Sequence, residues 1–175
     1  STFTNNTARV GGAMYSGRYN GDYPVVSVQN STFTGNMTTA GGGGGIYAEN
    51  TTSLTINNVD FTSNTATNGG GGGFYYNFAA GSLSVTGCDF IGNIVTTGNN
   101  GGAGFYVNGA GQTTFVGSCL FDNNQTINTG GPGGGIRIEN GSATVQNCTF
   151  TNNSVSSSGG GIYTYSNVTA FSILY

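Results

Sequence analysis

The chain has 175 residues, enough for one domain with a sizeable core, and only 5% of them are charged, with three arginines, no lysine and no histidine. A net charge of −3 excludes the basic surface that nucleic-acid binding requires, and no apolar run approaches the roughly 18 residues of a membrane span. Phenylalanine and tyrosine are plentiful and regularly placed among the 34 glycines, so we expect a folded chain rather than a disordered one.

The first element along the chain is a phenylalanine followed three residues later by an asparagine. It recurs at spacings of 28 to 31 residues, as Phe3/Asn6, Phe33/Asn36, Phe61/Asn64, Phe90/Asn93, Phe121/Asn124 and Phe150/Asn153. The second element is a glycine-rich phrase that ends in an apolar residue. These apolar residues are 26 to 32 positions apart, at Met14, Ile46, Phe74, Phe105, Ile136 and Ile162. Two markers with one period near 30 residues predict six copies of a stacked unit.

A third element is a short run before each internal phenylalanine in which apolar and polar residues alternate, the period of a strand. Its inward positions are Val26/Val28, Leu54/Ile56, Leu83/Val85, Thr114/Val116 and Ala143/Val145. Three short strands per turn of about 29 residues, without helical periodicity, predict an all-β fold. We expect a single-stranded parallel β-helix, a solenoid of about six turns, with residues 1–175 as one domain.

In such a solenoid, equivalent residues form columns because each lies one turn, or about 4.8 Å, above the last. We expect the phenylalanines to point inward, together with the residue two positions before each. That inward column contains Cys88, Cys119 and Cys148, which favours small core side chains and leaves their disulfide state open. We expect the repeated asparagine to take a left-handed turn conformation and to hydrogen-bond along its column.

One outward column consists mainly of tyrosines, each directly after the apolar residue of a glycine phrase. We predict a candidate contact surface for sugar rings or a partner at Tyr15, Tyr47, Tyr75, Tyr106 and Tyr163, with Arg137 at the fifth turn. The alternative is that the stacked rings stabilise one another and stay dry under loops.

The outward positions that flank the phenylalanines form two further columns. Threonines at both positions in three of the six turns resemble the face of an ice-binding protein, but acids and apolar residues interrupt them. Asp60 and Asp89 occupy one of these columns on adjacent turns, a spacing that would suit acid/base hydrolysis or calcium binding. Hydrolases of this kind need further groups around the carboxylates, and the chain lacks histidine and lysine, so we expect no catalysis. We also expect no metal and no cofactor.

Nine asparagines stand in the acceptor motif for N-glycosylation, where roughly six would arise by chance in so polar a chain. These candidates are Asn5, Asn30, Asn36, Asn50, Asn124, Asn140, Asn147, Asn152 and Asn167. Asn147 comes immediately before an inward cysteine, so we expect it to face outward.

The alternation of the phenylalanine–asparagine phrase with Gly-Gly-Ala and an aliphatic residue resembles the polymorphic outer-membrane proteins, autotransporter passengers that act as bacterial surface adhesins. Residues Gly11 to Met14 match this signature literally, and the other copies mostly carry glycine where the family has alanine. The resemblance implies a right-handed parallel β-helix on a cell surface or in an extracellular assembly.

The two ends of the chain match in phase. It starts on the strand of Phe3, and residues 170–175 fall where the strand before the next such phrase should lie. This match predicts head-to-tail stacking into a filament, or continuation of a longer array. We therefore expect a non-catalytic, extracellular structural or adhesive glycoprotein. The alternatives are a carbohydrate-binding or carbohydrate-active β-helix that uses the tyrosine column, and an ice-binding rod.

Overall fold

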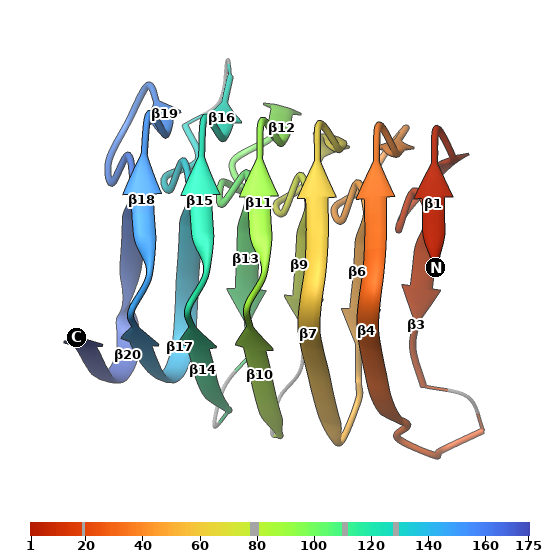
Figure 1. Ribbon diagram of the computed structural model, residues 1–175, viewed down its shortest axis with the longest axis horizontal. Helices are drawn as coiled ribbons and strands as arrows, with labels where there is room; N and C mark the ends of the chain where they lie inside the picture. Colours follow the sequence, from red (N-terminus) through yellow and green to blue (C-terminus); the bar gives the residue numbers. More distant parts are fainter. Residues whose placement is uncertain (19, 78–80, 110–111, 128–129) are drawn as a thin grey trace.

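The computed structural model describes residues 1–18, 20–77, 81–109, 112–127 and 130–175. Over these residues the chain winds into a rod in which every strand pairs in parallel with its equivalent one turn away (Figure 1). The predicted all-β parallel β-helix of about six turns is therefore confirmed. Among the described residues, no helix has the length and apolar character needed to cross a membrane.

The first three turns each contain three strands. They are β1 (Thr2–Thr4), β2 (Thr7–Ala8) and β3 (Met14–Ser16), then β4 (Val25–Thr34), β5 (Met37–Thr38) and β6 (Ile46–Glu49), then β7 (Ser53–Thr62), β8 (Thr65–Asn68) and β9 (Phe74–Asn77). The fourth turn contains β10 (Ser82–Thr86), β11 (Asp89–Ile91), β12 (Ile94–Thr97) and β13 (Phe105–Asn108). The remaining strands are β14 (Thr113–Gly117), β15 (Leu120–Asp122), β16 (Gln125–Thr126), β17 (Ile136–Gln146), β18 (Thr149–Thr151), β19 (Ser154–Val155) and β20 (Ile162–Leu174).

Two of the predicted strands join in the long strands β4 and β7, which bend at Asn30 and Asn58, where φ is 48° and 53°. The short strands after the asparagines form a separate six-stranded sheet in the order β19-β16-β12-β8-β5-β2. We did not predict these short strands. Their inward side chains, such as Thr38 and Ala66, are small and give little hydrophobic signal.

The core is a ladder of phenylalanine rings, as predicted. Phe33, Phe61, Phe90 and Phe121 are completely buried, and successive rings from Phe3 to Phe150 stack with centroids 4.6 to 5.2 Å apart. In-register pairing of identical residues places each ring on the next, which gives the rod one continuous apolar column.

A second ladder lies beside it, built from the repeated asparagines. Asn36 Nδ2 donates to Asn64 Oδ1 at 2.9 Å, and the same bond joins each neighbouring pair from Asn6 to Asn153. The expected left-handed conformation is, however, wrong for these residues. It belongs to the residue before each, at φ values of 52° to 63°: Asn5, Gly35, Ser63, Gly92, Asn123 and Asn152. The chain thus turns one residue earlier, which leaves the ladder asparagine free to point inward.

The glycine phrases form tight corners. Gly43 has a φ of 68°, and a side-chain Cβ there would lie 2.2 Å from the carbonyl oxygen of Ile46. Only glycine fits this position without moving the backbone.

Candidate functional site on the tyrosine face

The tyrosine column lies on the sheet face formed by β3, β6, β9, β13, β17 and β20, behind the front row of strands in Figure 1. The tyrosine side chains point away from the core because side chains alternate along a strand, and Ile46 and Ala48 on either side of Tyr47 are fully buried. In-register pairing then brings the column together in the order Tyr15, Tyr47, Tyr75, Tyr106, Arg137, Tyr163.

The column is open at one end and closed in the middle. Tyr15 is 52% exposed, Tyr47 and Tyr75 are half-buried, and Tyr106 is only 1% exposed. Glycine segments of the preceding turns cover the rings, since a Cβ on Gly70 would lie 2.0 Å from the Tyr106 ring. Tyr106 is therefore not part of the accessible contact surface that we predicted, and it fits the alternative, in which stacked rings stay dry.

The tyrosine rings pack on one another. Ring centroids are 5.7 Å apart for Tyr15 and Tyr47, and 4.8 Å apart for both Tyr47/Tyr75 and Tyr75/Tyr106. At these separations each ring covers much of its neighbour's face, so ring edges and hydroxyl groups point outward. Stacking on a sugar needs a free ring face, and between these turns the column does not offer one.

A companion column runs beside the tyrosines, two residues further along each strand. It holds Gly17, Glu49, Asn77, Asn108, Glu139 and Tyr165. The Tyr15 hydroxyl donates to Glu49 Oε1 at 2.5 Å, and the Tyr47 hydroxyl donates to Glu49 Oε2 at 3.2 Å. We did not predict this column from the sequence, although its constant offset of two residues from the tyrosines was a usable signal.

The electrostatics of the column keep the phenols protonated. The hydrogen bond to the Glu49 carboxylate, together with burial, raises the pKa of Tyr15. Burial raises the pKa of Tyr75 to about 12, against the opposing effect of its hydrogen bond to Asn108. Burial also raises the pKa of Tyr47 and of Tyr106. These hydroxyls are hydrogen-bond donors throughout the neutral pH range.

Arg137 replaces tyrosine at the fifth turn and is almost fully buried. Its guanidinium carbon lies 5.1 Å from the ring centroid of Tyr106 and 6.0 Å from that of Tyr163. Nη1 donates to the carbonyl oxygen of Asn99 at 2.8 Å, and Nη2 forms an ion pair with Glu139. The column therefore binds a cation here, supplied by the chain itself.

The family model described as the right-handed beta helix region matches residues 1–173. The chain belongs to the right-handed β-helix family. Comparison with curated proteins and with solved structures found no match. Membership of the right-handed β-helix family defines the architecture and the handedness, whereas function depends on the sites that a given chain carries. The narrower resemblance to the polymorphic outer-membrane proteins stays a prediction.

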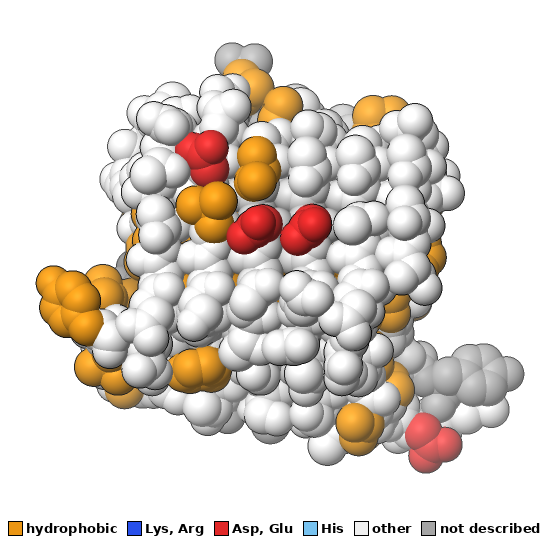
Figure 2. Space-filling model, in the orientation of Figure 1, with side chains coloured by type: hydrophobic (Ala, Val, Ile, Leu, Met, Phe, Trp, Pro, Cys, Tyr) orange, Lys and Arg blue, Asp and Glu red, His pale blue; other side chains and the backbone are white. Residues whose placement is uncertain are grey.

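The opposite face of this β-helix carries the phenylalanine-flanking columns. Figure 2 shows acidic and apolar side chains gathered in the middle of an otherwise polar face, over β7, β11 and β15. Asp60 and Asp89 lie directly opposite each other on β7 and β11, and burial together with the Asp60 charge raises the pKa of Asp89. With Ile91 and Leu120 in the same two columns, the threonines do not form a regular array.

The three cysteines share one column of the β-helix, as predicted. Cys88 and Cys119 are buried, Cys148 is half-buried, and all three are free thiols in the structure. Each Sγ lies 3.2 Å from the carbonyl oxygen two residues earlier. Among the described residues, no three or more His, Cys, Asp or Glu side chains are grouped so as to hold a metal ion.

The structure corrects two of the nine candidate glycosylation sites. Asn36 and Asn124 are fully buried, and their side-chain nitrogens donate within the asparagine ladder, so neither can accept a sugar in the folded β-helix. Asn50 and Asn140 are partly exposed, and the fully exposed candidates are Asn5, Asn30, Asn147, Asn152 and Asn167.

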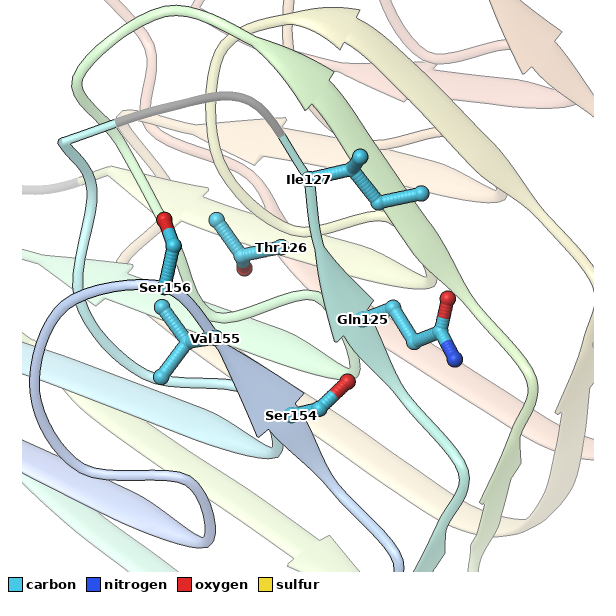
Figure 3. Close-up of a pocket in the computed structure, with 6 residues that line it drawn as sticks. All are labelled: Gln125, Thr126, Ile127, Ser154, Val155 and Ser156. Atoms are coloured by element: carbon cyan, nitrogen blue, oxygen red, sulfur yellow. The ribbon is translucent and has the colours of Figure 1, made fainter.

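The hollows on the described part of the surface include three of 300 to 340 Å³. The largest lies between β16 and β19, where Figure 3 shows Gln125 and Ser154 on one side of the strands and Thr126 and Val155 on the other. Its lining holds no titratable side chain. The other two hollows lie at the ends of the rod and are lined largely by core residues such as Phe3 and Phe150.

Proposed function

We propose that this β-helix is a non-catalytic, extracellular structural or adhesive protein that contacts an extended partner through its side faces. The observation that supports this role is the in-register repetition of outward groups. Ser53, Ser82, Thr113 and Ser142 lie directly opposite one another in successive turns. The same hydroxyl group thus recurs about every 4.8 Å along the rod.

Such repetition suits a partner that is itself repetitive. A polymer or a surface engages many equivalent weak contacts at once, and their combined strength exceeds that of any single contact. The low charge of the chain, 5% of residues, means that these contacts rest on hydrogen bonds and apolar contact more than on ion pairs. The exposed acceptor motifs and the resemblance to surface adhesins support an extracellular location.

The two ends of the rod support assembly along its axis. Phe3 and Met14 at one end, and Phe150 and Ile162 at the other, are only partly buried although they continue the core columns. We propose that a further β-helical turn covers each end, supplied head-to-tail by a second copy or by the same polypeptide. Electron microscopy of the isolated chain tests the first source: rods longer than six turns support it, and only short uniform rods contradict it.

Carbohydrate binding by the tyrosine face is the second candidate function. The observation that favours it is the Glu49 carboxylate with two phenol donors on an exposed part of the rod. Because the inner rings pack on their neighbours, contact of a sugar with Tyr47 and Tyr75 would run through hydroxyl groups and ring edges. A glycan array with the wild-type chain and a Tyr15→Ala variant tests this candidate.

Retention under flow tests the adhesive role. Labelled chain is passed over layers of polysaccharides and of extracellular proteins, and the same polysaccharides are assayed for new reducing ends. The proposal expects retention that rises steeply with the density of the layer, without new reducing ends. Absence of retention on every layer would overturn the adhesive role, and release of reducing ends would overturn the non-catalytic one.

A further inference from the structure

The fifth turn of the tyrosine column shows which group this surface can hold. There the guanidinium group of Arg137 lies between the rings of Tyr106 and Tyr163 and pairs with the carboxylate of Glu139. Planar guanidinium groups stack on aromatic rings and pair with carboxylates, and Arg137 does both, through its ring contacts and through Nη2 to Glu139.

The second turn carries the same carboxylate without an arginine. Glu49 stands two residues after Tyr47, just as Glu139 stands two residues after Arg137. The hydrogen bonds to Glu49 come from the neutral hydroxyls of Tyr15 and Tyr47. Within the described part of the chain, the one ion pair is that between Arg137 and Glu139. The negative charge of Glu49 is therefore balanced by no arginine of this chain within that part.

This position is open to a partner. Tyr15 is 52% exposed, whereas Tyr106 at the occupied turn is 1% exposed. Tyr15 packs one ring face on Tyr47 at a plane angle of 12°. Gly17 lets the Tyr15 ring lie along the strand, because a side-chain Cβ there would lie 2.5 Å from the Tyr15 hydroxyl oxygen.

We propose that Tyr15, Tyr47 and Glu49 bind the guanidinium group of an arginine on a partner protein. The inference rests on the proposed adhesive function, because it specifies the chemistry of one contact on the side of the rod. Charge favours it, since the chain carries a net charge of −3 and would attract a basic partner. Arginine fits better than lysine because only its planar group can stack on a ring and also pair with both carboxylate oxygens.

Binding of a small probe tests the inference on the whole chain. The probe is Gly-Arg-Gly with blocked ends, followed by chemical-shift changes in NMR spectra, and its control is the same peptide with neutral citrulline in place of arginine. We expect saturable shifts at Tyr15, Tyr47 and Glu49 with the arginine peptide alone. Glu49→Gln should weaken binding by about tenfold, the value of one charge-assisted contact.

Asp122→Asn is the matched control, because it removes the same charge from a partly exposed residue on the opposite face. It should change binding by less than about twofold if the contact is local. Tyr15→Ala should weaken binding as Glu49→Gln does, and unchanged amide spectra elsewhere would show that both variants fold.

Three results would overturn the inference: no saturable shift with the arginine peptide, equal binding of the citrulline peptide, or equal losses for Glu49→Gln and Asp122→Asn. Shifts at Tyr15 with a neutral oligosaccharide but not with the arginine peptide would also overturn it, in favour of glycan binding. Retention on layers without peptide binding would reject the inference and keep the adhesive function. Peptide binding without retention on any layer would reject the adhesive function and keep the inference.

Discussion

Asn64 Nδ2 donates to Asn93 Oδ1 at 3.0 Å, with both residues completely buried. The same nitrogen also donates to the carbonyl oxygen of Phe33 at 2.8 Å, so one amide joins three turns of the rod. Buried amides of this kind are stabilising only when every donor and acceptor has a partner, and repetition in register supplies those partners at each turn.

Replacement of Asn64 by alanine should therefore cost far more than a typical polar substitution. Its Oδ1 also accepts from the backbone and side-chain nitrogens of Asn36, so the change leaves several buried groups without partners. We expect the free energy of unfolding to fall by about 3 kcal/mol, measured by urea denaturation. The matched control is Asn57→Ala on an exposed column, which should cost about 0.5 kcal/mol. Equal losses for the two variants would contradict a structural role for the ladder.

The turn before the inward cysteine column offers a stabilising change. Ser118 is exposed and has a φ of 53°, while Asn30, Asn58 and Asn147 hold the same place in other turns with φ values of 48° to 53°. Asparagine tolerates this left-handed conformation better than serine. Ser118→Asn should raise the free energy of unfolding by about 0.5 kcal/mol.

The control for Ser118→Asn is Thr113→Asn, an exposed position in the extended strand β14. Asparagine is disfavoured in strands, so this variant should be slightly less stable than the wild type. A loss of stability in both variants would show that the left-handed conformation does not limit the turn.

The columns that repeat strictly could be predicted from the sequence, whereas the burial of single residues and the short strands could not. The period of the phenylalanines and asparagines gave the architecture, because in-register stacking follows directly from equal spacing. Burial of the tyrosines was one of two alternatives, and which ring is buried could not be predicted, because it depends on how the glycine segment at Gly70 crosses Tyr106. Nor could the short strand containing Ala66 and its equivalents, whose few small residues give no period to detect.

The candidate site could likewise be predicted only in part from the sequence. The tyrosine column was evident from the sequence, and so was its interruption at Arg137. The pairing of Arg137 with Glu139 within β17, and of Tyr15 with Glu49 across turns, depends on side-chain directions. A strand places residues two apart on one face, so Glu49 and Glu139 were accessible to the same reasoning once the tyrosine face had been chosen.

Glycosylation should follow exposure and not the acceptor motif alone. When the chain is secreted from a eukaryotic cell, we expect sugar at Asn147, which is exposed, and none at Asn36 or Asn124, which are buried in the ladder. Peptide mapping before and after glycosidase treatment measures occupancy at each site. Sugar on Asn124 would mean that the modification precedes folding of this turn, and would contradict the expected order.

The Asp60–Asp89 pair should make stability depend on pH in a direction opposite to that of Asp122. Burial and the neighbouring Asp60 charge raise the pKa of Asp89 above its ordinary 3.8. A carboxyl group raised in this way contributes stability that is fully present below pH 3.8 and is lost as the pH rises through the folded value. Asp89→Asn should therefore be more stable than the wild type at neutral pH, with the difference disappearing at low pH.

Hydrogen bonds from Thr151 and Asn152 lower the pKa of Asp122, so its stability contribution is present above pH 3.8 and is lost as the pH falls through the lower folded value. Asp122→Asn should be the less stable variant at neutral pH, and thermal unfolding of both variants between about pH 2 and 7 measures the two trends. Parallel pH profiles for the two variants would contradict this account, because they would show that only the net charge matters.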